Sequence, residues 1–185
     1  MPFLVDVMCG GLVSYLRMCG YDTAYAGDRN LEVDDDLLAV ARSERRTILT
    51  RDVALAARAE DADTGGNAGA DVDAILLESL AVEDQLVELE EAGVRLELAD
   101  EPTRCGRCNG RLERVTETPD STPEYAPDPG EERVWWCRDC GQWFWTGSHW
   151  DRVRETLARV GSRTGGANGT GALETGAGAD ETDGQ

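Results

Sequence analysis

Three aspartates, Asp6, Asp34 and Asp52, each lie where a strand is predicted to end or a helix to begin. In an open α/β sheet the carboxyl ends of the parallel strands meet at one edge, and ligands bind there. Two carboxylates about 4 Å apart repel by about 4 kcal/mol at an effective dielectric constant of 20, so such a cluster requires a cation. Oxygen ligands select Mg²⁺ or Mn²⁺, which commonly serve phosphodiester hydrolysis. We predict an acidic metal site, although each aspartate alone is more typical of a solvated surface.

Two C-x-x-C pairs form the second chemical motif: Cys105, Cys108, Cys137 and Cys140. A spacer of 28 residues separates the pairs, and Gly110 and Gly141 follow them closely. This pattern predicts a structural four-thiolate zinc site, since a segment of this size cannot fold on apolar burial alone. Disulfides are the main alternative, and a cytoplasmic setting disfavours them. The remaining cysteines, Cys9 and Cys19, are interpreted as small buried residues, with a redox pair as the alternative.

All five tryptophans follow the first cysteine pair, and they suggest a second binding surface. The segment 143–145 alternates Trp, Phe and Trp, as in a strand with one face in a core and one outward. Core packing would explain part of these rings. Exposed rings such as Trp145, with arginines nearby, would stack on single-stranded bases. His149, the only histidine, is a candidate for substrate contact or proton transfer, and a structural role at a helix start is the alternative.

Short apolar runs alternate with helical periodicity along the first hundred residues. This order predicts a mostly parallel sheet with helices on both faces, so the fold class is α/β. We expect Asp34 to cap the second helix and a surface loop at 61–71. The predicted strands are 3–5, 22–25, 47–50, 74–77 and 94–98, and the predicted helices begin near residues 12, 35, 54, 82 and 149.

The composition changes near residue 101 and again near residue 161. We expect one domain over 1–100, a small zinc ribbon with a C-terminal helix over 101–160, and a disordered acidic tail over 161–185. Residues 1–102 contain 8 Arg and 23 acidic residues, a net charge of −15, whereas residues 103–160 have a net charge of −1. The second section would therefore repel a polyanion much less than the first.

The whole chain is strongly acidic, with a net charge of −19 and a pI near 4.3, and its 18 basic residues are all Arg. This combination suggests a halophilic protein in a salt-rich cytoplasm, and an acidic mesophilic protein is the alternative. The sequence contains no apolar run long enough for a membrane span and no basic and then apolar leader. We therefore expect a cytoplasmic protein without a membrane partner; protein partners and oligomeric state are not predicted.

Several motifs together resemble one family, the Mut-seven C-terminal RNase domain family. They are FLVDVMCGGLVSYLRMCGYDT, DDDLLAVAR, TILTRD, the two C-x-x-C pairs and WTGSHW. The resemblance covers about residues 1–155 and implies a PIN-like nuclease fold followed by a zinc ribbon, with RNA as the substrate. It also implies site residues at the matching positions, which are the acids Asp6, Asp34 and Asp52 and the neighbours Arg17 and Arg51.

The chain departs from this family at one position, because Gly11 stands where the family has a basic residue. If that residue holds phosphate, activity here would be weaker. The fourth acid of PIN-like sites is not assigned, and Asp28, Asp35 and Asp36 are the candidates.

The favoured function is therefore a Mg²⁺- or Mn²⁺-dependent ribonuclease in which the ribbon assists RNA binding. A non-catalytic RNA- or ribosome-binding adaptor is the first alternative, and a protein-interaction module on an inactive nuclease is the second. A phosphatase with an aspartyl nucleophile is a weaker third alternative. It would need D-x-D-x-T on the first strand, where this chain has Asp6, Val7 and Met8.

Overall fold

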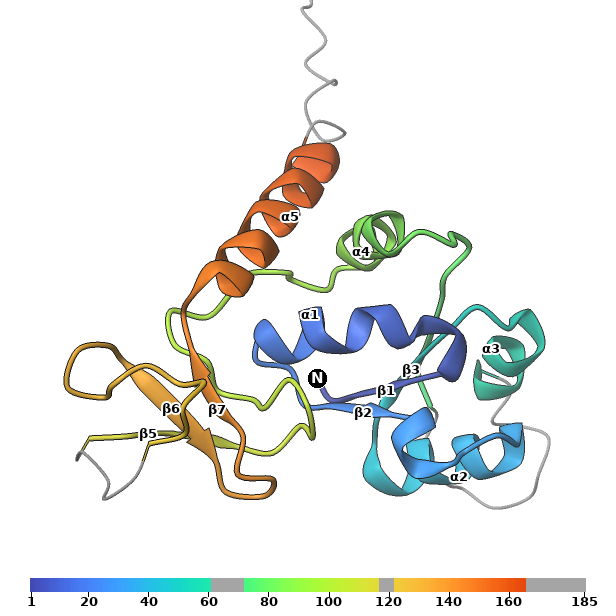
Figure 1. The fold of residues 1–185 in the computed structure, drawn as a ribbon. Helices are drawn as coiled ribbons and strands as arrows, with labels where there is room; N and C mark the ends of the chain where they lie inside the picture. The colour runs from blue at the N-terminus through green and yellow to red at the C-terminus, as the bar shows by residue number, and fades with distance from the viewer. Residues whose placement is uncertain (61–71, 117–121, 166–185) are drawn as a thin grey trace, which may run out of the picture.

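A four-stranded parallel sheet forms the centre of the molecule. The computed structural model describes residues 1–60, 72–116 and 122–165. The strand order is β2-β1-β3-β4, and Val5 of β1 pairs with Tyr25 of β2 and with Leu49 of β3 (Figure 1). The strands are β1 (Phe3–Val5), β2 (Thr23–Tyr25), β3 (Thr47–Thr50) and β4 (Ala74–Leu76).

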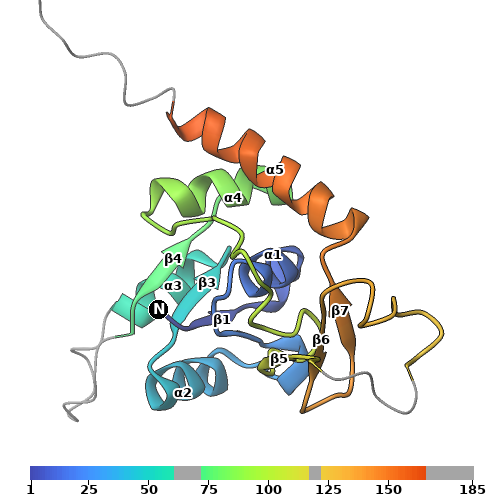
Figure 2. The ribbon, with the colours of Figure 1, turned by 90° about the vertical axis from the view of Figure 1, so that its left-hand side faces the viewer.

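Helices cover both faces of this sheet, as the sequence predicts. Side chains alternate across a strand, so Phe3 and Val5 enter one core, with α1, α4 and α5, and Leu4 enters another, with α2 and α3 (Figure 2). The helices are η1 (Val7–Leu12), α1 (Val13–Met18), η2 (Gly27–Arg29), α2 (Asp34–Glu44), α3 (Val53–Glu60), α4 (Val82–Glu91) and α5 (Ser148–Gly165). Each of α1, α2, α3 and α4 follows a strand, so these helices begin near the carboxyl edge of the sheet.

A three-stranded antiparallel ribbon lies beside the sheet, next to the edge strand β2 (Figure 1). It consists of β5 (Leu112–Arg114), β6 (Val134–Cys137) and β7 (Trp143–Trp145). β5 pairs with β6, and β6 pairs with β7. The four-cysteine segment is therefore a ribbon with a long connection between β5 and β6, as the long spacer predicts.

The last helix packs against α4, in the core on one face of the sheet, although the sequence groups it with the ribbon. Trp150, Val153, Leu157 and Val160 of α5 are buried in the same core as Phe3 and the α4 residues. Figures 1 and 2 both show α5 beside α4. The ribbon is therefore flanked in the chain by two segments that pack into the core of the sheet domain, residues 94–98 before it and helix α5 after it.

Two local expectations are wrong, whereas the first α-helix begins at Val13 as predicted and is preceded by the 3-10 helix η1. Residues 94–98 form no strand, because the segment pairs with no described strand and instead inserts Val94 and Leu96 into the core. The chain is helical through Gly165, so the predicted disorder does not begin at Gly161. The predicted loop at 61–71 and the tail from residue 166 onward lie outside the described residues.

Within the described part of the chain, no helix has both the length and the apolar character needed to cross a membrane.

Candidate functional site

One hydroxyl group joins the ends of β1 and β3 at the carboxyl edge of the sheet. Asp6 is 7% exposed, and the Thr50 hydroxyl donates a hydrogen bond of 2.7 Å to its Oδ2. The Thr50 oxygen also accepts a hydrogen bond of 3.0 Å from the backbone N–H of Asp52. Among the described residues no donor reaches the other oxygen of Asp6, Oδ1. Asp6 and Asp52 therefore lie at the same edge of the sheet and are connected through Thr50, which contacts the carboxylate of Asp6 and the backbone of Asp52.

Asp52 also caps helix α3. Its Oδ1 accepts hydrogen bonds from the backbone N–H groups of Ala54 (2.8 Å) and Leu55 (3.1 Å). These bonds satisfy N–H groups in the first turn that have no partner within the helix, and the carboxylate charge suits the helix N-terminus. The cap uses only one carboxylate oxygen, so Oδ2 remains as a candidate metal ligand.

Asp34 lies elsewhere on this edge and has a different partner. It is the first residue of α2 and not its cap, since Val33 occupies the cap position and makes no side-chain hydrogen bond. Its carboxylate forms an ion pair of 3.0 Å with Arg58 of α3, which also pairs with Asp35. The prediction that Asp34 caps the helix is therefore wrong, and its charge is already neutralised by an arginine.

The three aspartates do not gather into one cluster. Across residues 1–60, 72–116 and 122–165, only the four cysteines form a group of three or more His, Cys, Asp or Glu residues whose ligand atoms all lie within 4.8 Å of one another. Asp6 and Asp52 have oxygen donors of the kind that Mg²⁺ or Mn²⁺ prefers. The predicted three-carboxylate site is therefore not preformed in this structure.

Other charged groups surround the buried thiol of Cys9, one turn beyond Asp6. Burial raises the pKa of Cys9 to about 11, and the charges of Asp6 and Glu88 add to the rise, whereas the charge of Arg51 opposes it. Burial therefore favours the neutral thiol form of Cys9. These influences also place Arg51 and Glu88 in the surroundings of Cys9.

Glu88 is an acid that the sequence analysis missed. Its carboxylate accepts hydrogen bonds from the backbone N–H groups of Glu78 (2.9 Å) and Ser79 (3.0 Å), which follow β4. It therefore fixes the β4–α4 loop near Cys9. Glu88 lies in a helix with several other acidic residues, so its sequence position does not distinguish it as a site residue.

The candidates for a fourth acid have arginine partners of their own. Asp28 forms an ion pair with Arg17 at 3.5 Å, and Asp35 pairs with Arg58.

Arg51, which the resemblance assigns to the site, lies between Thr50 and Asp52 in the chain. Its Nε is buried and has no hydrogen-bond partner among the described residues, and no ion pair to a described acid occurs. A buried guanidinium nitrogen without a partner is costly, so an additional anionic ligand would stabilise this arrangement.

The Gly11 departure has a steric explanation. A Cβ at this position would lie 2.5 Å from Cγ2 of Val82, the first residue of α4. Helix α4 therefore occupies the space that a side chain at position 11 would need. A basic residue here would require the Val82 side chain to turn away or α4 to shift.

Exposed apolar side chains lie at the same edge. Val53 is 68% exposed and Leu80 is 80% exposed, although both precede or begin helices whose other faces are buried. Further exposed apolar residues in the strand-to-helix connections and at the end of β4 are Val7, Met8, Val33 and Leu76. Exposed apolar groups gathered around charged ones are typical of a binding surface. This edge is therefore marked by apolar as well as acidic residues.

The four cysteines of the ribbon lie close enough together to bind one metal ion. The Sγ atoms of Cys105 and Cys140 lie 3.6 Å apart, and those of Cys108 and Cys137 lie 3.5 Å apart. A tetrahedral zinc with Zn–S bonds of about 2.3 Å requires sulfur separations of about 3.8 Å. The arrangement thus fits the predicted structural zinc ion, with all four positions filled by protein.

Arg17 connects this metal site to the sheet and is not placed to bind substrate. It is 3% exposed. Its Nε donates to the carbonyl of Thr23, and its Nη1 donates to the carbonyls of Gly106 (3.0 Å) and Arg107 (3.1 Å), inside the first cysteine pair. The expectation that Arg17 is a substrate-binding residue is therefore wrong. Its side chain is buried beneath the loop 105–108, the zinc loop, where RNA cannot reach it.

Trp145 and His149 lie together at a cavity of about 350 Å³ between α1, the first cysteine loop, β7 and the start of α5. Trp145 is partly buried and His149 is exposed. Of the other tryptophans, Trp135 and Trp150 are buried, in agreement with the expectation that core packing explains part of the cluster. The structure thus brings these two predicted binding residues to one pocket.

The comparisons with known proteins give one match. The family model described as Mut7-C RNAse domain matches residues 1–157. Comparisons with curated proteins and with solved structures found no match.

Proposed function

The chain belongs to the Mut7-C RNAse domain family, and we propose that it is a metal-dependent ribonuclease that hydrolyses RNA phosphodiester bonds at the carboxyl edge of its sheet. The observation that supports this most is the hydrogen-bonded arrangement of Asp6, Thr50 and Asp52. It connects the ends of β1 and β3, so Asp6 and Asp52 both lie at this edge, each with one carboxylate oxygen held by a hydrogen bond and one oxygen without a described donor.

Asp6 and Asp52 are the residues that would hold Mg²⁺ or Mn²⁺. Such an ion supplies an activated water and neutralises charge at the phosphate. Thr50 would keep the Asp6 carboxylate in one orientation, because its short hydroxyl is 0% exposed and already hydrogen-bonded on both sides. Arg51 would bind a phosphate oxygen through the nitrogen that has no described partner.

Asp34 has a secondary role in this proposal. Since Arg58 pairs with it at 3.0 Å, it can reach an ion near Asp6 only after this pair opens. We therefore propose that Asp34 assists cation or substrate positioning and that Asp6 and Asp52 provide the essential charges. Substitution of Asp6 or Asp52 should therefore lower the cleavage rate more than substitution of Asp34.

The test is cleavage of labelled RNA by the zinc-loaded chain in KCl with Mn²⁺. Asp6→Asn keeps the shape of the side chain and should lower the cleavage rate at least about a hundredfold. Asp34→Asn should lower it less than about tenfold, since an exposed ion pair contributes little.

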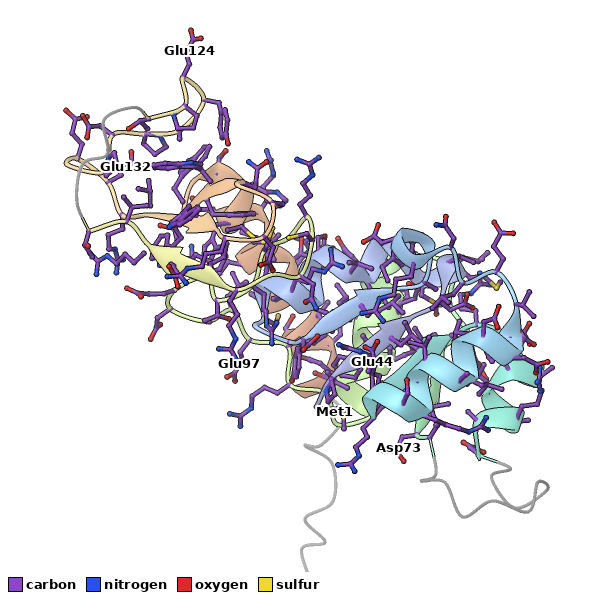
Figure 3. All side chains as sticks on the ribbon, turned by 90° about the horizontal axis from the view of Figure 1, so that it is seen from below. Met1, Glu44, Asp73, Glu97, Glu124 and Glu132 are labelled. Atoms are coloured by element: carbon purple, nitrogen blue, oxygen red, sulfur yellow. The ribbon has the colours of Figure 1, made fainter. Side chains whose placement is uncertain are left out.

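The matched control is Asp73→Asn. Asp73 is exposed and directly precedes β4, so it lies at the opposite edge of the sheet, toward which Met1 and Glu44 also lie (Figure 3). The Asp73→Asn variant should cleave RNA at the same rate as the wild type. Equal cleavage by Asp6→Asn and Asp73→Asn would exclude the proposed site.

A non-catalytic RNA-binding adaptor is the second candidate, and it is favoured by the absence of a preformed carboxylate cluster among the described residues. This function predicts that the wild type binds RNA but cleaves none with Mg²⁺ or Mn²⁺. The same assay, followed by a binding measurement on uncleaved RNA, decides between the two functions.

A further inference from the structure

The cavity between the sheet helices and the ribbon has walls that differ in chemistry. Its buried floor contains Met18 of α1, Pro102 and Trp150. Phe144 and Trp145 of β7 form an aromatic wall. The polar residues that line the cavity are Ser14, Arg104, Arg107 and His149. A volume of about 350 Å³ is in the range of small-ligand pockets, which are mainly apolar with a few polar groups.

The Trp145 indole lies against the segment that follows β7. A Cβ at Gly147 would lie 2.7 Å from Nε1 of Trp145, so the ring packs directly against this glycine. The ring therefore offers an aromatic surface to the cavity that it lines.

Arg107 supplies a positive charge at the rim. Most described arginines form ion pairs in this acidic chain, but Arg107 is exposed and forms none with a described acid. Its backbone carbonyl is held by Arg17, so the zinc loop fixes the start of its side chain. An aromatic ring and an arginine without an acidic partner in one cavity are the combination that binds a base and its phosphate.

We propose that this cavity binds one unstacked base of a single-stranded RNA, with the base stacked on Trp145 and an adjacent phosphate bound by Arg107. The inference rests on the proposed ribonuclease function only for the identity of the nucleic acid. The cavity lies beside Ser14 and Met18, which follow Asp6 by 8 and 12 residues along η1 and α1. These helical rises correspond to roughly 15–20 Å, so the bound base lies a few nucleotides from the scissile bond.

Binding is measured separately from cleavage. The zinc-loaded chain with Asp6→Asn is titrated into a fluorescein-labelled single-stranded 12-nucleotide RNA, without Mg²⁺ or Mn²⁺. Adding Trp145→Ala should weaken binding roughly fivefold to a hundredfold, the range of one lost base–aromatic stack. Arg107→Ala should also weaken binding, and its exposed position makes a folding defect an inadequate explanation.

The matched control is Trp136→Ala, because Trp136 is another ribbon tryptophan, 37% exposed, that does not line the cavity. This variant should bind like its parent. Zinc content and the unfolding midpoint of each variant are measured alongside.

A set of RNAs, each with one abasic ribose, then identifies the bound base. One position should lose affinity by the same factor as Trp145→Ala, and this loss should disappear in the Trp145→Ala protein. If Trp145→Ala and Arg107→Ala bind RNA as Trp136→Ala does, the proposal is overturned and the cavity is left for a protein segment. If Trp145→Ala and Arg107→Ala weaken RNA binding as expected but the wild type cleaves no RNA, the proposed ribonuclease function is overturned and the proposed base-binding site stands.

Discussion

Thr50 is the residue that connects the two strongest candidates for catalysis. Its hydroxyl donates to Asp6 and accepts from the Asp52 backbone, and the residue is completely buried. The sequence proposes both aspartates as candidates, because each lies at the end of a predicted strand. Nothing in the sequence distinguishes Thr50 from Thr47, since the linking role depends on the neighbouring strand.

Thr50→Val should weaken both stability and activity. Valine has almost the same shape but leaves a buried carboxylate oxygen and a backbone N–H without this partner, which costs about 1–3 kcal/mol. Urea unfolding should show this loss of stability, and Mn²⁺-dependent cleavage should fall because the Asp6 carboxylate is no longer fixed.

Thr50→Ser is the control for this change, because it retains the hydroxyl and removes only a methyl group. It should keep most of the cleavage activity. If valine and serine variants cleave RNA equally, the hydroxyl does not organise the site.

At the scale of elements, polar contacts attach the zinc loop to the edge strand β2. Asn109 Oδ1 accepts a hydrogen bond of 2.9 Å from the Thr23 backbone, and Asn109 Nδ2 donates to Asp22 at 2.8 Å. Burial disfavours the ionised form of Asp22, but hydrogen bonds from Arg46 and Asn109 and the charges of Arg46 and Arg104 outweigh it and lower the pKa of Asp22. The ribbon thus satisfies backbone and carboxylate groups that an open sheet edge would expose.

Arg17→Met tests whether the zinc loop and the sheet stabilise each other. It leaves the carbonyls of Thr23, Gly106 and Arg107 without their donor, and we expect a loss of about 2–4 kcal/mol in unfolding free energy. Zinc transfer to a chromogenic chelator should become faster, because the loop that carries Cys105 and Cys108 is no longer held.

Arg114→Met provides the comparison for Arg17→Met. Arg114 is in β5, is 50% exposed and forms only an ion pair of 3.9 Å with Glu101. Unchanged zinc transfer in both variants would show that the zinc loop folds independently of Arg17.

Local patterns were sufficient for most elements and misleading where long-range packing decides. The four strands of the parallel sheet lie next to strong turn or helix signals, and the sequence predicts all four. Residues 94–98 have the same alternation, but Tyr21 donates to the Arg95 carbonyl at 2.8 Å and the segment pairs with no described strand. Arg17 was placed at the site because its motif matches, and only the fold reveals that the zinc loop covers it.

At the scale of the whole molecule, charge is unevenly divided. The net charge is −19, and most of it belongs to residues 1–102. Like charges at this density repel in the folded state, and salt shortens the range of the repulsion from about 10 Å at 0.1 M to about 3 Å at 1 M. The section with the zinc site and the tryptophans has almost no net charge, so it is the part that RNA can approach most easily.

Raising KCl from 0.1 M to 1 M should therefore raise the thermal unfolding midpoint by several degrees. Over the same range the affinity for RNA should fall, because phosphate contacts release counterions. Zinc content measured at each salt concentration ensures that metal loss does not cause the change. A midpoint that is constant or falls with KCl would contradict the role assigned to self-repulsion.

The most direct test of the ribonuclease assignment is the Mn²⁺-dependent cleavage rate of Asp52→Asn, measured together with its unfolding free energy. Asparagine caps a helix about as well as aspartate, so the contacts with Ala54 and Leu55 and the stability should be nearly unchanged. We predict that cleavage is nevertheless lost, because the substitution removes a charge required for the divalent ion. Wild-type cleavage by this stable variant would contradict the assignment and leave Asp52 as a helix cap only.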